Sequence, residues 1–201
     1  MRMSNIVQDM FTKSIAIFEN YSPEVIESIH DNDDNVDLLN RDIKFYLARI
    51  SEESLSEEQA QEQLSLLSVP AAIEEIGDII SQNLTKLARK YTDAGITFSE
   101  DGLKDLKELH RRTLDNITLA NTAFATQNQE IAIKVINNKR RIGDTLEEFQ
   151  QKHLERLREE VDASRSSSGI HMEVLALLVR INVLITKLAR TTLRSRSSDD
   201  R

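Results

Sequence analysis

Apolar side chains recur at intervals of three and four residues between positions 66 and 87 of the chain. This spacing predicts a long helix whose one face packs at a shallow angle against neighbouring helices. Asn83 falls in the same register, and we expect it to act as a polar residue that fixes the pairing of the helices. The apolar members of the seam are Leu66, Val69, Ile73, Ile76, Ile80 and Leu87.

The same periodicity predicts six helical segments along the chain. They cover roughly residues 4–18, 22–50, 56–90, 99–124, 128–161 and 170–188. Ser22 followed by Pro23 is a typical helix start, and Ser56 with Gln59 predicts a capping box for the third segment. Pro70 is expected to kink that segment. The polar stretch 164–169 is expected to form a loop.

Short sequence motifs occur twice. Thr85-Lys-Leu-Ala-Arg89 recurs identically as Thr186-Lys-Leu-Ala-Arg190, and 46–50 resembles 153–157. The repeat predicts an all-α fold of two tandem three-helix units, with six long antiparallel helices. We place the first unit at 1–92, a linker at 93–98 around Gly95, the second unit at 99–194 and a flexible tail at 195–201.

The amino-acid composition excludes several kinds of site and partner. With 201 residues, five glycines and two prolines, the chain has few tight turns, in keeping with long helices. It has no cysteine, which excludes disulfides and thiolate metal sites. The formal net charge of −8 argues against nucleic acid as a partner. No signal peptide is expected, and the most apolar run, 174–185, is too short to span a bilayer.

A pair of carboxylates stands out in the middle of the third segment. Glu74 and Asp78 are four residues apart, so both project from one side of the helix, away from the isoleucine stripe. Gly77 lies beside them, although glycine costs about 1 kcal/mol relative to alanine in a helix interior.

These residues resemble the Glu-Arg-Ile-Gly-Asp signature of the PhoU domain family, helical regulators of phosphate uptake. Glu74, Ile76, Gly77 and Asp78 match the signature, and Glu75 replaces its arginine. Asn83-Leu84 and the stretches 36–39, 98–99, 153–157 and 180–182 make the chain most similar to the C-terminal PhoU-like domain of bacterial sodium/phosphate cotransporters. The duplicated three-helix architecture of that family agrees with the repeat.

The resemblance implies a metal site, because the family's Glu-x-x-x-Asp motif is associated with metal binding. A divalent metal or iron would then lie on the carboxylate face, held by Glu74 and Asp78 with Asp33 and Asp37 as donors from the second segment. A solvated acidic face is the competing interpretation, and the sequence favours it. In the second repeat apolar residues such as Leu175 and Val179 replace the carboxylates.

No arrangement of nucleophile and base, phosphate-binding loop or dinucleotide fingerprint is present in the sequence. His153 lies on an apolar stripe, where we expect a core histidine rather than a ligand. The sequence therefore predicts no enzyme. It predicts no certain cofactor either.

The resemblance implies a cytosolic regulatory domain at the inner face of the membrane. It would modulate phosphate transport by contacting a membrane phosphate transporter or a transmembrane part of its own protein. The alternatives are a freestanding metal-binding phosphate regulator and a helical scaffold that forms homodimers.

Overall fold

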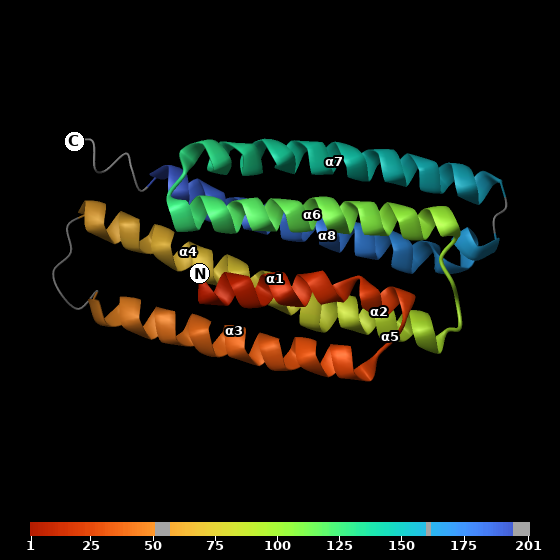
Figure 1. The fold of residues 1–201 in the computed structure, drawn as a ribbon, viewed down its shortest axis with the longest axis horizontal. Coiled ribbons are helices and arrows are strands. Elements are labelled where there is room, and N and C mark those ends of the chain that lie inside the picture. Colours follow the sequence, from red (N-terminus) through yellow and green to blue (C-terminus); the bar gives the residue numbers. More distant parts are fainter. Residues whose placement is uncertain (51–56, 160–161, 195–201) are drawn as a thin grey trace.

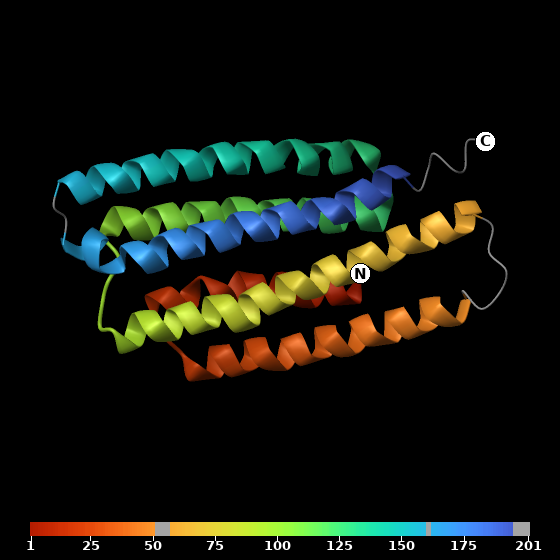
Figure 2. The same cartoon turned by 180° about the vertical axis from the view of Figure 1, so that it is seen from behind.

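The computed structural model describes residues 1–50, 57–159 and 162–194, and these are almost entirely helical (Figure 1). No strand occurs among them. The helices are long and lie roughly side by side, as the turned view also shows (Figure 2). Their bounds are α1 Arg2–Ser14, α2 Ala16–Glu19, α3 Pro23–Ile50, α4 Glu57–Asp78, the π-helix η1 Ile79–Leu84, α5 Thr85–Asp93, α6 Glu100–Thr126, α7 Gln129–Arg158 and α8 Asp162–Arg194.

The helix predicted for residues 4–18 is interrupted. α1 ends at Ser14 and the short α2 begins at Ala16. Ser14 is buried, and its hydroxyl donates to the backbone carbonyl of Phe11 at 2.8 Å, a local bond that competes with regular helix. The next start was predicted correctly: Val25 N–H donates to the Ser22 hydroxyl at 3.2 Å, and α3 begins at Pro23.

The third predicted helix contains an irregularity that the sequence did not reveal. α4 continues through Pro70, and the geometry changes at 79–84, where the backbone forms the π-helix η1. The wider turn of a π-helix rotates the residues that follow it. Leu84 is therefore buried and Asn83 is exposed, so the predicted register-fixing role of Asn83 is wrong.

The other seam residues with described side chains are buried as predicted, namely Val69, Ile73, Ile76, Ile80 and Leu87. The side chain of Leu66 and the predicted capping box at Ser56 and Gln59 lie outside the described residues, as does the predicted tail 195–201.

In the second half, α6 and α7 start where predicted, and the structure differs from the prediction at one loop. Ser99 Oγ accepts from Gly102 N–H at 3.1 Å, and Asn128 Oδ1 accepts from Ile131 N–H at 3.0 Å. The stretch 164–169, predicted as a loop, belongs to α8. Two of its serines, Ser164 and Ser167, are buried, and Ser164 donates to Ser99 at 3.1 Å, so part of this polar sequence lies inside the fold.

The helices pack as two groups of three. α6, α7 and α8 contact one another, as do α1, α3 and α4, while α4 on α8 and α1 on α6 join the two groups. Residues 94–99 cross between the groups at one end of the bundle (Figure 1). The predicted all-α fold of two three-helix units is confirmed. The division into domains at 93–98 stays a prediction.

Within the described part of the chain, no helix is both long enough and apolar enough to cross a bilayer.

Candidate functional site

Gly77 lies on the face of α4 that contacts α3. It is buried, and a Cβ atom added to it would stand 2.6 Å from Oδ1 of Asp33 on α3. No side chain fits at that separation, so the backbone of α4 reaches the Asp33 carboxyl only because residue 77 is a glycine. This close approach explains a glycine in the middle of a long helix.

Asp33 is a buried carboxyl group with few partners. Its side chain is 8% exposed, Oδ2 accepts the hydroxyl hydrogen of Ser81 in η1, and Oδ1 has no hydrogen-bond partner among the described residues. Burial raises the pKa of Asp33 to about 6, and the Asp37 and Asp78 carboxylates add to the rise, while the Ser81 hydroxyl opposes it. The sequence carries no signal for Ser81, because its contact with Asp33 depends on how α3 and η1 pack.

The three other predicted site residues surround Asp33 without converging on one point. Asp37 is exposed, and Glu74 and Asp78 are half-buried. Asp78 Oδ1 accepts from Gln82 Nε2 at 2.7 Å. Burial raises the pKa of Asp78, and Asp37 and Glu75 contribute. The three aspartates therefore repel one another across the α3–α4 contact.

A resident divalent metal would need several oxygen ligands that converge on one point. Across residues 1–50, 57–159 and 162–194, no group of three or more His, Cys, Asp or Glu side chains could hold an ion. Ser81 donates to Oδ2 of Asp33, and the backbone at Gly77 lies close to Oδ1. Of the predicted ligands, Asp37 and Glu74 remain, and they line one groove. Two carboxylates are fewer ligands than a divalent cation takes from a dedicated protein site. The metal site at Asp33, Asp37, Glu74 and Asp78 stays a prediction without a fitting ligand set.

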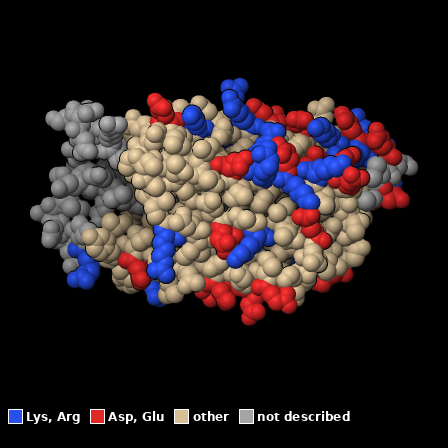
Figure 3. Space-filling model, viewed as in Figure 1, with Lys and Arg blue, Asp and Glu red and all other residues tan. Residues whose placement is uncertain are grey.

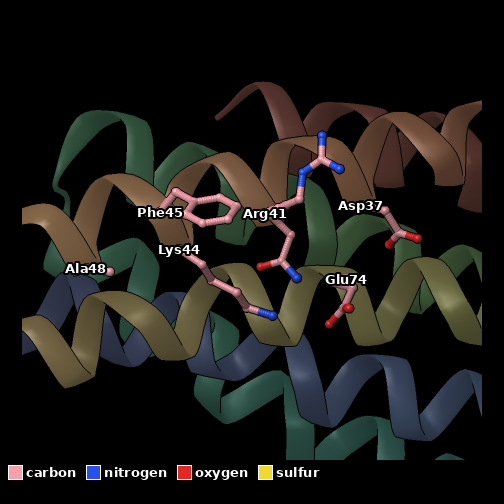
Figure 4. Close-up of a pocket in the computed structure, with 7 residues that line it drawn as sticks. Asp37, Arg41, Lys44, Phe45, Ala48 and Glu74 are labelled. Carbon is pink, nitrogen blue, oxygen red and sulfur yellow. The ribbon is translucent and has the colours of Figure 1, made fainter.

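A groove beside this contact contains groups that the sequence analysis missed. It has a volume of about 460 Å³ and runs along α3, with one wall from α4 (Figure 4). Both signs of charge line it, and the signal in the sequence is that these charges recur at helical spacing on one face of α3. Its lining residues are Asp37, Asn40, Arg41, Lys44, Phe45, Ala48 and Glu74.

The histidines of the second unit are core residues, as predicted for His153. The rings of His153 and His171 stack with centroids 4.8 Å apart. His153 Nε2 lies 2.8 Å from the Ser168 hydroxyl, and His171 Nε2 lies 3.1 Å from the Gly102 carbonyl. Burial, and then the neighbouring His153, lower the pKa of His171 to about 4, so this pair is neutral at physiological pH.

Comparison with known proteins agrees with this geometry. Residues 1–85, which carry the Gly77 contact, match the family model described as PhoU domain. This part of the chain is therefore similar to a PhoU domain. The crystal structure of PhoU from Pseudomonas aeruginosa superposes with a TM-score of 0.84, covering 96% of this chain and 90% of that one at 16% identity. That structure shows the shared PhoU fold, which extends over both three-helix units.

The curated relatives are longer proteins. The chain is 28% identical over 167 residues to proteins named "Putative inorganic phosphate export protein YjbB" from Escherichia coli K12 and Salmonella typhimurium LT2. The match covers 83% of this chain and 31% of those proteins, so the chain spans about a third of their length. The predicted PhoU resemblance is confirmed.

Proposed function

We propose that this chain is a non-enzymatic PhoU-like domain that regulates phosphate transport at the cytosolic face of a membrane. The observation that carries the proposal is the PhoU match over residues 1–85 together with longer relatives named for phosphate export. Its partner is a membrane phosphate transporter, or a transmembrane part of the same protein. The predicted likeness to the tail of a sodium/phosphate cotransporter belongs to this proposal.

The mechanism is a shift between arrangements of the two three-helix units. The units are joined on the surface by an ion pair in which Arg180 on α8 approaches Glu75 on α4 at 2.7 Å. Both side chains are more than a third exposed, and exposed pairs contribute at most about 1 kcal/mol. A partner that contacts α4 can therefore replace this surface pair at small cost, while a shift of the units must also rearrange the buried contacts between them, such as the stack of Phe11 on His110.

Two observations favour regulation over catalysis. The PhoU match is to a domain that the sequence analysis associates with regulation. In addition, the buried His110 lies 2.7 Å from the Phe11 carbonyl and stacks on the Phe11 ring, so its ring is held as part of the core.

A freestanding PhoU-like regulator is the second candidate, favoured by the 90% coverage of the Pseudomonas PhoU chain. In its metal-binding form it requires stoichiometric binding of a divalent metal or iron that Glu74→Gln/Asp78→Asn abolishes. A helical scaffold that forms homodimers is the third, and a concentration-independent monomer in sedimentation would exclude it.

Phosphate flux in the native host tests the proposal. Removing the segment that encodes this chain should change net radiolabelled phosphate flux and its response to external phosphate. The matched variants are Glu75→Arg, Arg180→Glu and the double charge swap. Each single variant places like charges opposite each other and should shift the response, and the swap should restore it. Unchanged flux after removal of the segment would refute the regulatory role.

A further inference from the structure

The chemical character of the side chains that line the groove on α3 changes from one end of the groove to the other. Figure 4 shows the carboxylates of Asp37 and Glu74 at one end, the cations of Arg41 and Lys44 in the middle, and Phe45 at the other end. On the surface, acidic side chains gather along the lower edge of Figure 3, over α3, and basic ones follow towards one end. A ligand that fits this groove must present a cationic group, an anionic group and an apolar part in that order.

The polar groups of the groove have no partners among the described residues. The structure records no ion pair or hydrogen bond for the side chains of Asp37, Arg41, Lys44 or Glu74 within the described ranges. Asn40 is 3% exposed, and its Oδ1 has no hydrogen-bond partner there. Because this oxygen is sealed from solvent, the groove offers a ligand its four charged side chains rather than Asn40 Oδ1.

The apolar end of the groove continues onto an exposed surface of α3. Phe45 is 65% exposed, and Ala48, which also lines the groove one turn further along α3, is exposed as well. Aromatic side chains beside arginine and lysine are typical of surfaces that lie at the boundary between lipid headgroups and acyl chains. This extension is larger than a small soluble ligand needs.

We propose that the groove binds the headgroup of an ethanolamine phospholipid and thereby holds this face of the domain on a membrane. The primary ammonium group donates to the carboxylates of Asp37 and Glu74. The phosphate lies between Arg41 and Lys44, which suit it by charge and hydrogen bonding. The glycerol and the start of the acyl chains lie against Phe45.

The charges that line the groove favour a zwitterionic headgroup over a plain anion. The four charged side chains of the groove sum to zero, so a zwitterion is matched, whereas a plain anion is repelled by Asp37 and Glu74. A choline headgroup has the same charges, but its quaternary nitrogen has no hydrogen to donate to Asp37 and Glu74. The groove should therefore prefer ethanolamine over choline and should not respond simply to negative charge.

Vesicle flotation with the full chain tests the inference, and it involves no transporter, so its result is separate from that of the flux experiment. Vesicles of phosphatidylcholine alone are compared with vesicles containing phosphatidylethanolamine or phosphatidylglycerol. We expect binding that requires phosphatidylethanolamine. Arg41→Ala/Lys44→Ala should remove most of the binding, because both charge-assisted contacts to the phosphate are lost, and Phe45→Ala should weaken it less.

The control is Lys187→Ala/Arg190→Ala, which removes two exposed cations with the same spacing from α8. It should leave binding unchanged, and circular dichroism should show all variants folded. Equal binding to phosphatidylcholine, binding only to phosphatidylglycerol, an equal loss in the control, or no binding to any vesicle would each overturn the proposal. Binding of soluble phosphoethanolamine without vesicle binding would overturn the membrane assignment.

Discussion

Asp33 in the first unit and Asp105 in the second are buried to nearly the same extent, at 8% and 7% exposed. Their partners differ. Asp105 Oδ2 accepts from Arg156 Nη2 at 2.8 Å, an ion pair that ties α6 to α7. Asp33 has no cation, accepts only the Ser81 hydroxyl, and faces Asp37 and Asp78. Burial raises the pKa of both carboxyl groups, and Arg156 opposes the rise at Asp105.

The difference shows that Asp105 connects two helices, whereas the Asp33 carboxyl lowers the stability of the fold. A buried charge with its counter-ion makes a specific connection between helices, whereas a buried carboxyl among other carboxylates lowers stability. Groups with strongly raised pKa values near a groove are typical of functional sites. The comparison therefore points to the α3–α4 face, where the PhoU match and the groove also lie.

The largest expected effect comes from breaking the paired carboxyl. Arg156→Ala leaves Asp105 buried without its counter-ion and should lower the free energy of unfolding by about 3 kcal/mol, measured by urea denaturation. Arg158→Ala, an exposed arginine two residues away, should change it by less than about 0.5 kcal/mol. Adding Asp105→Asn to Arg156→Ala should recover part of the loss. Equal losses for the two arginines would contradict the assignment.

The second-largest expected effect comes from the close contact between Gly77 and the Asp33 carboxyl. Gly77→Ala pushes a methyl group against Asp33 Oδ1 and should destabilise the fold by about 2 kcal/mol. Gly143→Ala on α7 is the matched control, because its added Cβ meets nothing within 4 Å and should stabilise the helix by up to about 1 kcal/mol. In an Asp33→Ala background the cost of Gly77→Ala should shrink. If both glycine variants gain stability, the close approach is not limiting.

The helices could be predicted from sequence wherever local signals decide them. Ser22-Pro23, Ser99 and Asn128 set helix starts that the structure confirms, because capping is a local interaction. Two features depended on distant packing instead. The π-helix at 79–84 places Leu84 rather than Asn83 in the core, and burial of Ser164 against Ser99 continues α8 through a polar stretch.

The site was predictable only in part for the same reason. Gly77 and the neighbouring carboxylates could be found from spacing and from the family signature. The role of Asp33 depends on Ser81, which is 48 residues away and meets it through the packing of α3 and η1. The ordered charges of the groove need α3 and Glu74 of α4 to be placed side by side, and no one-dimensional pattern supplies that.

The smallest effect concerns the charge of Asp33 and has a definite pH dependence. Its pKa is about 6 in the folded chain against an ordinary 3.8, so the folded state holds this proton more tightly than the unfolded state. The contribution of Asp33 to stability is therefore most favourable below pH 4 and is lost as the pH rises through 6. Asp33→Asn removes the ionised form while keeping an acceptor for Ser81. It should gain about 1 kcal/mol at pH 7.5, less than the full shift implies because water and relaxation screen the charge, and nothing at pH 4.

Denaturation of both proteins at the two pH values measures this gain, and Asp105→Asn is the control. Losing the Arg156 pair should make Asp105→Asn less stable than the native chain at pH 7.5, although burial raises both pKa values. Opposite signs for the two substitutions at the same pH would show that the partner of a buried carboxyl, rather than its burial, decides whether its charge is tolerated. A loss for Asp33→Asn at pH 7.5 would mean instead that the Asp33 charge is compensated in the folded chain, and the case for a functional α3–α4 face would then rest on the groove alone.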